Sequence, residues 1–342
     1  MIAGALVIAA ALILSVNALE LGPATAQKAT PARPTATAEK ATPALPTAPP
    51  GIADDRCTTP PTVRKATFRH KRSRLISKEG SANHRGLDLI ASADDARQRI
   101  TGKLAYGKLD KDIEDEDVEV FACVKAAWRS LGTARTDDDG RFAVELTDAA
   151  RLGVGMRDLY VASLGDGGGA YFLALVAPRS MSVVVTDIDG TLTSSENGII
   201  QTAVAGKDLA HRPGAPEALA SLGRTVVYVT ARGDVFAEVT RRWLERHGFP
   251  RGPLVVYQGA FARPGRHAVD HKIDVFGALP VAVAAGIGNR KSDIDAYRKL
   301  GVLPTMILIY LPDYEDEVRA DLAAGKATGF DDYRKLRALI PL

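Results

Sequence analysis

Five short runs of continuously apolar residues, separated by segments with helical periodicity, constrain the fold of the C-terminal half most strongly. The expected strands are residues 182–186, 225–230, 254–257, 282–286 and 305–310. The expected helices are residues 215–222, 235–247 and 292–300. Strands that are apolar on both sides are buried on both faces, which indicates a parallel sheet covered by helices. Residues 181–342 are therefore predicted to form an α/β domain with a Rossmann-like parallel sheet, whose ligand binds beyond the carboxyl ends of the strands.

The first strand runs directly into the segment Asp187-Ile188-Asp189-Gly190-Thr191, which carries two carboxylates one residue apart. Asp187 is the candidate nucleophile, because its attack on phosphorus would give an aspartyl-phosphate and divide hydrolysis into two easier displacements. Asp189 is the candidate acid and base, which protonates the leaving oxygen and later deprotonates water. Gly190 permits a sharp turn, and Thr191 is expected to tether the loop and to contact the substrate phosphate. The alternative, a capped strand-to-helix turn, accounts for the same residues less specifically.

The second strand ends at Thr230-Ala231-Arg232-Gly233, just before a predicted helix. A hydroxyl and the free N–H groups of a loop that enters a helix form a natural phosphate cradle. Thr230, Ala231 and Arg232 are therefore candidate phosphate-binding residues, although Arg232 could equally pair with a surface acid. A cation is also needed to offset the charge of the transferring phosphoryl group and of the nucleophile. Lys272 is the candidate for this role.

The fourth strand ends in the segment Gly288-Asn289-Arg290-Lys291-Ser292-Asp293. Carboxylates that meet at one edge of a sheet repel one another and the substrate unless a hard cation bridges them, and Mg²⁺ prefers oxygen ligands. The candidate metal ligands are Asp187, Asp189, Asn289 and Asp293. Because Asn289 and Asp293 are four residues apart, a loop residue and a residue of the first helical turn can face one centre. We expect one of these two to bind Mg²⁺ directly and the other directly or through water.

Residues 86–178 have the pattern of a small β-sandwich domain. Short strands are expected at residues 100–106, 118–124, 142–146, 159–164 and 171–176, with turn clusters between them. The stretch "GTARTDDDGRFAVEL" resembles a hairpin of transthyretin-like or carboxypeptidase-regulatory sandwiches. Its three aspartates are interpreted as turn formers rather than a calcium site, because the later Glu of an EF-hand loop is missing. The acidic loop 110–117 is interpreted as a solvated face.

The N-terminal part is predicted to export the chain. An apolar run at residues 2–14, followed by Ala24-Thr25-Ala26, indicates a signal peptide or anchor over residues 1–26, although no Lys or Arg precedes the run. A buried N-terminal helix is the alternative. Residues 27–80 are predicted to be a Pro/Ala/Thr-rich linker with a basic run that either is solvated or contacts anionic lipid headgroups. A periplasmic, secreted or membrane-anchored location would permit a disulfide between the only two cysteines, Cys57 and Cys123.

Composition narrows the class of protein further. The apolar share of 46% and the charged share of 25% are those of a soluble globular protein. The formal net charge of +3 is too small to indicate a nucleic-acid partner. With two cysteines in the chain, zinc-finger spacing is excluded. These values favour a globular enzyme or a binding protein.

The C-terminal half resembles the lipin-type phosphatidate phosphatases of the haloacid dehalogenase superfamily, and the related C-terminal domain of phosphatidylinositol transfer proteins. The shared segments are "DIDGTLTSSENGII", "GKDLAHRPGAPEAL", "YVTARG", "RRWLERHGFPRGPLV" and "GIGNRKSDIDAYRKLGV". The resemblance implies that Asp187 is the nucleophile, Asp189 the acid and base, and Asn289 and Asp293 the metal-side residues. It also implies phosphatidate or a similar lipid phosphate as substrate, with diacylglycerol and phosphate as products. The sequence "HKIDVF" around Lys272 departs from the lipin pattern.

The spacing of the strands bears on the size of the substrate. The intervals between Thr193 and the second strand and between Thr230 and Gly288 leave no room for an independently stable cap, since units below about 40 residues rarely fold alone. A haloacid dehalogenase-type site without a large cap is open to bulky substrates or to a bilayer surface. A lipid phosphate at a membrane is therefore favoured. The alternatives are a phosphatase of soluble or protein phosphomonoesters and a non-catalytic phosphatidate-binding module.

Overall fold

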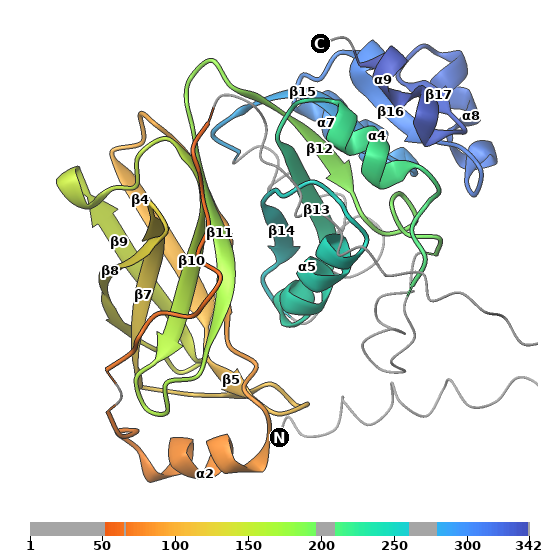
Figure 1. The fold of residues 1–342 in the computed structure, drawn as a ribbon. Coiled ribbons are helices and arrows are strands. Elements are labelled where there is room, and N and C mark those ends of the chain that lie inside the picture. The colour runs from red at the N-terminus through yellow and green to blue at the C-terminus, as the bar shows by residue number, and fades with distance from the viewer. Residues whose placement is uncertain (1–51, 65, 196–208, 260–278, 341–342) are drawn as a thin grey trace, which may run out of the picture. The chain divides into compact units, whose positions relative to one another are not determined.

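β12 (Ser182–Asp187), the strand that ends in the candidate nucleophile, lies inside a six-stranded parallel sheet with the order β14-β13-β12-β15-β16-β17 (Figure 1). The computed structural model describes residues 52–64, 66–195, 209–259 and 279–340. The other strands of this sheet are β13 (Val226–Gly233), β14 (Leu254–Tyr257), β15 (Ala282–Gly288), β16 (Ile307–Tyr310) and β17 (Thr328–Phe330). The predicted α/β class is confirmed. The short edge strand β17 was not predicted, because three residues that include a glycine carry little strand signal.

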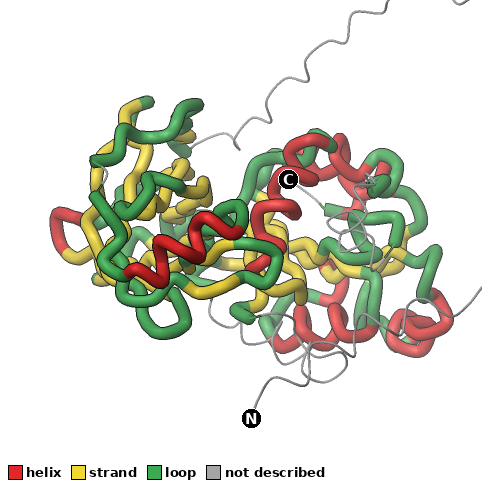
Figure 2. The backbone as a smooth tube through the Cα atoms, turned by 90° about the horizontal axis from the view of Figure 1, so that it is seen from below, coloured by secondary structure: helices red, strands yellow, loops and turns green. Residues whose placement is uncertain are grey.

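Helices cover both faces of the sheet, as Figure 2 shows. The helices of this domain are α4 (Ala215–Ser221), α5 (Ala237–Arg246), α7 (Lys291–Lys299), α8 (Glu315–Ala323) and α9 (Leu336–Leu339). Short 3₁₀ helices are η2 (Asp234–Phe236), η3 (Pro304–Met306) and η4 (Tyr333–Lys335). Val184 packs in one core with residues of α4, α5 and α9, whereas Val183 and Val185 pack in the other with residues of α7 and α8. Successive valines of β12 are thus buried on opposite faces of the sheet, which is why the strand is continuously apolar.

Two sheets form the predicted β-sandwich: a mixed sheet, in which β1 and β3 pair in parallel with their neighbours, and an antiparallel sheet. The first has the order β3-β11-β10-β7-β8 with β1 beside β10, and the second has the order β2-β4-β9. The strands of the first are β1 (Asp54–Asp55), β3 (Leu89–Ser92), β7 (Asp117–Val124), β8 (Ala127–Arg135), β10 (Gly155–Ser163) and β11 (Gly169–Ala177). Those of the second are β2 (Arg85–Gly86), β4 (Arg97–Lys103) and β9 (Arg141–Thr147), followed by η1 (Asp148–Ala150). Val120 and Leu159 of one sheet share a hydrophobic core with Ile100 and Val144 of the other.

The predicted hairpin around the three aspartates is wrong. β8 pairs with β7 and β9 pairs with β4, so the segment between β8 and β9 carries the chain from one sheet to the other. The turn itself is formed as expected: Asp137 Oδ1 accepts from the backbone N–H groups of Asp139 and Arg141. The real hairpin joins β7 to β8 through Lys125 and Ala126, both with positive φ. These residues are not typical of such a turn, and β8 is largely exposed, so neither feature was visible in the sequence pattern.

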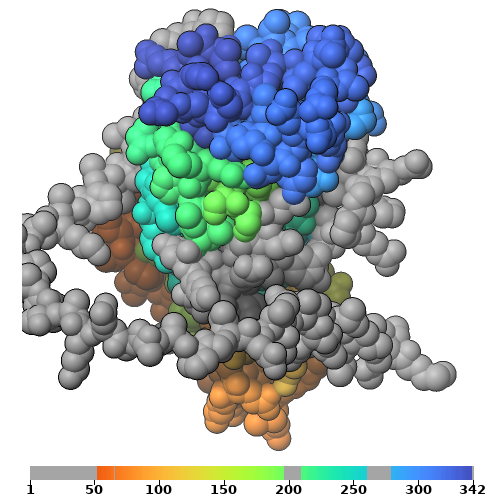
Figure 3. Space-filling view, turned by 90° about the vertical axis from the view of Figure 1, so that its right-hand side faces the viewer, coloured from red at the N-terminus to blue at the C-terminus, as the bar shows by residue number. Residues whose placement is uncertain are grey.

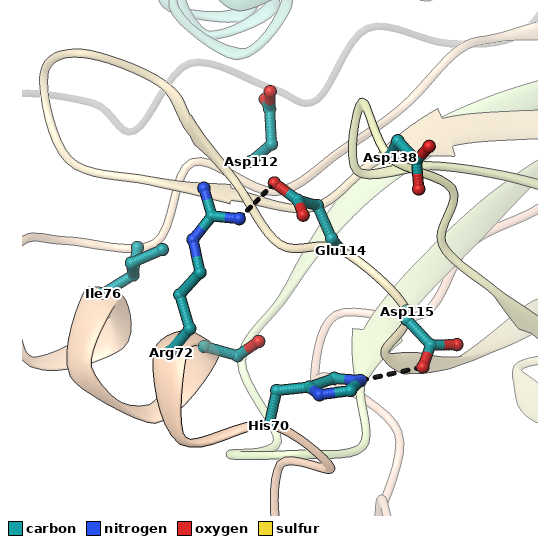
Figure 4. Close-up of a pocket in the computed structure, with 8 residues that line it drawn as sticks. His70, Arg72, Ile76, Asp112, Glu114, Asp115 and Asp138 are labelled. Atoms are coloured by element: carbon teal, nitrogen blue, oxygen red, sulfur yellow. Dashed lines mark hydrogen bonds and ion pairs between the residues drawn. The ribbon is translucent and has the colours of Figure 1, made fainter.

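The acidic loop is solvated only in part, because the side chains of Asp115 and Asp117 are partly exposed whereas Glu116 is buried. Glu116 is 1% exposed and accepts from the backbone N–H groups of Arg69 and His70 at 2.8 and 2.9 Å. A cavity of about 190 Å³ lies between this loop and α2 (Lys71–Glu79), and two of its lining pairs bridge the gap (Figure 4). His70 Nε2 lies 2.8 Å from Asp115, and Arg72 donates to Glu114 at 2.7 Å. Two arginines of the basic run, Arg69 and Arg72, therefore pair with acids of this loop, Asp115 and Glu114.

The described part of the predicted linker is folded against the β-sandwich. Residues 52–80 contain β1, which pairs with β10, and the helix α2. Cys57 forms a disulfide with Cys123 of β7, with a Cα–Cα distance of 5.8 Å. The predicted signal peptide or anchor, residues 1–26, lies outside the described residues. Within the described ranges, no helix is both long and apolar enough to cross a membrane.

Reduction of the Cys57–Cys123 disulfide is expected to lower the free energy of unfolding by about 3 kcal/mol, because the bond closes a long loop in the unfolded chain. The two cysteines are 66 residues apart in sequence. Urea unfolding with and without dithiothreitol measures the effect. The double variant C57S/C123S is the control, and its stability should not respond to the reductant. A wild-type chain equally stable in both conditions would contradict the prediction.

Acid is expected to weaken the β-sandwich through His84. Burial lowers the pKa of this imidazole from 6.5 to about 4, against the opposing charge of Asp166. The unfolded chain therefore binds a proton near pH 6.5 that the folded chain does not, so stability is complete above this pH and falls as the pH drops toward 4. The expected loss is about 3 kcal/mol. Urea unfolding between pH 7.5 and 4.5 tests this, and H84Q should show a flatter pH dependence; identical slopes for both chains would contradict it.

Candidate active site

The carboxyl ends of β12 and β15 bring three predicted site residues together. Asp187 ends β12 and is 4% exposed, and Asn289 follows β15 and is 1% exposed. The hydroxyl of Thr191 connects them, because it donates to Asp187 Oδ2 at 2.9 Å and lies 3.2 Å from Asn289 Oδ1. Thr191 therefore tethers the loop as predicted. Two oxygen-bearing side chains from neighbouring strands meet in a buried position at the edge of the sheet where ligands bind in folds of this type.

The turn after Asp187 is held by residues to which the sequence pattern assigned no role. Gly190 has a φ of +74°, a conformation that favours glycine, and its carbonyl accepts from Arg212 at 2.9 Å. Arg212 forms an ion pair with Asp313 and lies 4.9 Å from the centre of the Tyr310 ring. Tyr333 donates to the carbonyl of Thr191 at 2.9 Å. In Figure 3 the green part of the surface lies directly against the blue, C-terminal part.

Asp189 is bound by the carboxyl-terminal part of β13. The Thr230 hydroxyl donates to Asp189 Oδ2 at 2.7 Å, and Arg232 Nε donates to Asp189 Oδ1 at 2.9 Å. The Arg232 side chain is 4% exposed and that of Asp189 is 23% exposed, so the arginine pairs with a partly buried acid of the candidate site. The backbone N–H of Arg232 donates to the Thr230 hydroxyl at 3.2 Å, and Ala231 lies between them in the same strand. Binding of a substrate phosphate by these three residues stays a prediction.

Asp293 caps the helix α7 from within. Its Oδ2 accepts from the backbone N–H groups of Asn289 and Arg290, both at 3.0 Å, and the side chain is fully buried. Gly288 makes this approach possible, because a Cβ at this position would lie 2.4 Å from Asp293 Cβ. A carboxylate that accepts the free N–H groups at a helix start is favoured by the helix dipole. Asp293 therefore orients Asn289, which is the residue of the pair that faces Asp187.

The donor chemistry of the site fits a hard cation such as Mg²⁺. Asp187 and Asn289 present carboxylate and amide oxygens, and Asn289 Nδ2 is a buried amide atom without a hydrogen-bond partner among the described residues. Amide oxygen and nitrogen positions can be interchanged, so this unpartnered position can equally present an oxygen ligand. Across the described ranges, no group of three or more His, Cys, Asp or Glu side chains is placed to hold a metal. The Asp187 carboxylate and the Asn289 amide supply oxygen donors of the kind that such an ion prefers.

Two buried tyrosines donate hydrogen bonds to the backbone that carries the site residues. Tyr297 donates to the carbonyl of Ile287 at 2.9 Å, and burial raises its pKa well above the ordinary value. Burial likewise raises the pKa of Tyr333 well above the ordinary value. Both phenols are therefore protonated hydrogen-bond donors at neutral pH. They keep β15 and the turn after β12 in place without adding charge.

Of the predicted site residues, Lys272 lies outside the described residues. The others lie at the carboxyl ends of β12, β13 and β15, in the turns that follow, or, for Asp293, in the first turn of α7; they are Asp187, Asp189, Thr191, Thr230, Ala231, Arg232, Asn289 and Asp293. The contributions of Arg212 and Tyr333 were missed, although a charged residue in the apolar context "AHRPGAPEAL" is a signal that could have pointed to Arg212. Tyr333 gave no such signal, because it lies in a separate C-terminal segment.

Two family models match consecutive parts of the chain. Residues 82–176 match the β-sandwich domain of the PITM 1–3 proteins, and residues 184–310 match the LNS2 domain of the same proteins. The segment that contains the parallel sheet is thus similar to an LNS2 domain, and the segment before it is similar to a β-sandwich domain. The two matches have the order in which the structure has the two domains, and they leave α8, β17 and α9 outside.

Three named proteins are among the relatives to which this chain is similar. Membrane-associated phosphatidylinositol transfer protein 3 of Mus musculus is 30% identical over 75% of this chain. The protein retinal degeneration B of Drosophila melanogaster is 29% identical over 70%, and the phosphatidate phosphatase LPIN3 of Mus musculus is 28% identical over 38%. This chain spans only 26%, 19% and 18% of these relatives, respectively. It is therefore similar to the β-sandwich and LNS2 region of phosphatidylinositol transfer proteins and, over a shorter part, to a phosphatidate phosphatase.

Proposed function

We propose that this chain is a Mg²⁺-dependent phosphatidate phosphatase that hydrolyses a phosphomonoester at a membrane surface. The observation that carries the proposal is the buried contact among Asp187, Thr191 and Asn289, because the Asp187 carboxylate there lies close to a second side-chain oxygen. Similarity to LPIN3, whose name is phosphatidate phosphatase, and to lipid-transfer proteins supports a phosphatase-related and lipid-associated role. The segment Asp187-Ile188-Asp189 carries both carboxylates that the proposed reaction needs.

The proposed reaction has two displacements. A carboxylate oxygen of Asp187 attacks phosphorus, the P–O bond to diacylglycerol breaks, and the leaving oxygen takes a proton from Asp189. Asp189 then accepts a proton from water, whose oxygen attacks phosphorus and releases inorganic phosphate while the Asp187 carboxylate is regenerated. Oxygens of Asp187 and Asn289 would hold Mg²⁺, which when bound offsets the charge of the phosphoryl group.

The carboxyl-terminal part of β13 holds the candidate acid in this scheme. Thr230 and Arg232 donate to the Asp189 carboxylate at 2.7 and 2.9 Å. These hydrogen bonds would keep Asp189 at the end of the sheet at which Asp187 lies, where it can face the leaving oxygen.

Phosphate release from a panel of substrates tests the function. With Mg²⁺, phosphatidate in mixed micelles should be hydrolysed at least about tenfold faster than glycerol phosphate, a sugar phosphate or a phosphopeptide at equal concentration. EDTA should abolish release, and added Mg²⁺ should restore it. Higher rates on the soluble phosphates would replace the lipid assignment with a soluble or protein phosphomonoester. Absence of release from every substrate would contradict the proposed enzyme.

A phosphatidate-binding module without turnover is the second candidate. It is favoured by the similarity to proteins named for phosphatidylinositol transfer and by the engagement of Asp189 with Arg232. In that case vesicles containing phosphatidate should bind the chain while no phosphate is released. Co-sedimentation with such vesicles, with phosphatidylcholine vesicles as the control, separates this candidate from the first.

We also propose that the chain acts outside the cytoplasm. The Cys57–Cys123 disulfide supports this location, because such bonds persist in oxidising compartments, and so does the apolar run at residues 2–14. Expression in a bacterial host, followed by fractionation and mass spectrometry without reductant, tests the proposal. The expected product is an exported or membrane-bound chain with Cys57 linked to Cys123. A cytoplasmic chain with both thiols free would contradict it.

A further inference from the structure

Asp234 connects the carboxyl-terminal end of β13, which carries Thr230 and Arg232, to the β-sandwich. It follows β13 directly, two residues after Arg232, and 2% of its side chain is exposed. Two arginines of the β-sandwich donate to this carboxylate: Arg85 of β2 at 3.0 Å and Arg141 of β9 at 2.9 Å. The end of β13, whose residues bind Asp189, is therefore followed directly by a residue that is held by arginines far away in the sequence.

The contact has a defined geometry. Arg85 is itself held by Asp110, which accepts from its two terminal nitrogens at 2.8 and 2.7 Å, and the arginine side chain is 5% exposed. A planar guanidinium between two carboxylates fixes the orientation of both, because its donors form a rigid fork. Asp110, Arg85, Arg141 and Asp234 are called the Asp234 clamp below. In a buried network of this kind, loss of one partner forces the remaining charges to rearrange.

The Asp234 clamp lies close in sequence to the two residues that bind the candidate acid, Asp189. Asp234 is two residues from Arg232, which donates to Asp189, and four from Thr230, which donates to the other oxygen of the same carboxylate. A displacement of Asp234 therefore moves both donors that locate Asp189. A misplacement of about 1 Å in an active site can cost about 100-fold in rate.

We propose that Asp234 is a positioning residue of the phosphatase site, through which the β-sandwich sets the location of the Asp189 carboxylate. This inference rests on the proposed function, in which Asp189 protonates the leaving oxygen. The β-sandwich is then a working part of the catalytic unit and not a spacer. Asp234 itself contacts neither substrate nor metal in this scheme.

The dependence of the rate on the leaving group tests the proposal. Protonation by Asp189 matters greatly for phosphatidate, whose leaving group is an alkoxide, and little for p-nitrophenyl phosphate, whose leaving group departs as a stable anion. We expect D234N, in the full chain, to lower kcat for phosphatidate by at least about 30-fold and kcat for p-nitrophenyl phosphate by less than about threefold. KM should change by less than about threefold for both substrates.

Two further variants show whether the effect of D234N comes from the loss of the clamp or from a loss of folding. Arg141 is 28% exposed, so R141Q weakens the clamp with little risk to the fold and should shift the ratio of the two kcat values in the same direction. Arg251 forms ion pairs with Asp54 and Asp158 of the β-sandwich, but it precedes β14 and so lies at the opposite edge of the sheet. R251M is therefore the matched control: it removes a similar contact and should leave the ratio unchanged.

Amide hydrogen exchange, measured by mass spectrometry, provides a second readout that needs no turnover. D234N and R141Q should speed exchange in the peptide that covers residues 187–193, and R251M should not. Equal losses of kcat on both substrates, or unchanged exchange in this peptide, would overturn the positioning role. A wild-type chain that hydrolyses neither substrate would refute the proposed function and the catalytic part of this inference. The exchange result alone would still show whether Asp234 orders the loop.

Discussion

Replacement of Asp187 by Asn is expected to lower the rate of phosphate release from phosphatidate by at least about 1000-fold, because an amide cannot form the aspartyl-phosphate. The fold should survive, since Asn retains an oxygen that accepts the Thr191 hydroxyl in place of Asp187 Oδ2. Phosphate release by D187N and wild type, at equal concentrations and with Mg²⁺, measures the effect. Circular dichroism and the urea midpoint should show that both chains are folded.

The matched control for this prediction is D295N, which makes the same chemical change on α7. Asp295 lies two residues beyond the buried Asp293, and in the described structure it is partly exposed. D295N should therefore retain the wild-type rate within about threefold. Undiminished activity of D187N would rule out Asp187 as the nucleophile, and an equal loss in D295N would show that the assay reports general damage.

Replacement of Asp88 by Ala is expected to lower the free energy of unfolding by about 3–5 kcal/mol, because it leaves a buried guanidinium without its partner. The Asp88 side chain is fully buried, and it accepts from Arg241 of α5 at 2.7 and 2.8 Å. It also accepts from the backbone N–H groups of Leu173 in β11 and Leu254 in β14, both at 2.7 Å. One carboxylate thus joins an edge of the β-sandwich to a helix and a strand of the α/β domain.

Urea unfolding of D88A and wild type measures this loss. D94A is the control from the same domain, because Asp94 forms an exposed ion pair with Arg179, and its removal should cost less than about 1 kcal/mol. The double variant D88A/R241M should recover part of the loss, since it removes the uncompensated charge as well. A loss below about 1 kcal/mol in D88A would show that this contact does not hold the two domains together.

Much of the α/β domain was predictable because its strands are buried on both faces. All five predicted strands of this domain are present, and β14 has the predicted bounds. α8 and β17 were not predicted, since α8 begins with three acids and has no clear apolar stripe, and β17 is short. In the β-sandwich the exposed strand β8 was missed for the same reason, and the pairing of β9 with β4 was not visible at all. Local patterns report burial and backbone preference, whereas strand partners depend on the whole chain.

For the candidate site too, some features were predictable from the sequence and others were not. The sequence pattern located the strand ends that carry Asp187, Thr230 and Asn289, because the chemistry of each segment is local. It left open whether Arg232 binds phosphate or an acid, and the structure shows Asp189 as its partner. It interpreted residues 110–117 as a solvated face, although Asp110 binds Arg85 and Glu116 is buried. The sequence gives the type of a charged residue but not its surroundings. Whether an acid faces water or a distant arginine could therefore not be predicted.

The sequence by itself determined the α/β class, the edge of the sheet at which the site lies, and the kinds of oxygen and nitrogen groups gathered there. These follow from short-range periodicity and from the rule that parallel strands present their carboxyl ends on one side. Only the tertiary structure decided that Thr191 joins Asp187 to Asn289, that Cys57 pairs with Cys123, and that Asp234 is held by arginines of the β-sandwich. Each of these contacts joins segments far apart in the chain, and its formation depends on how complete domains pack.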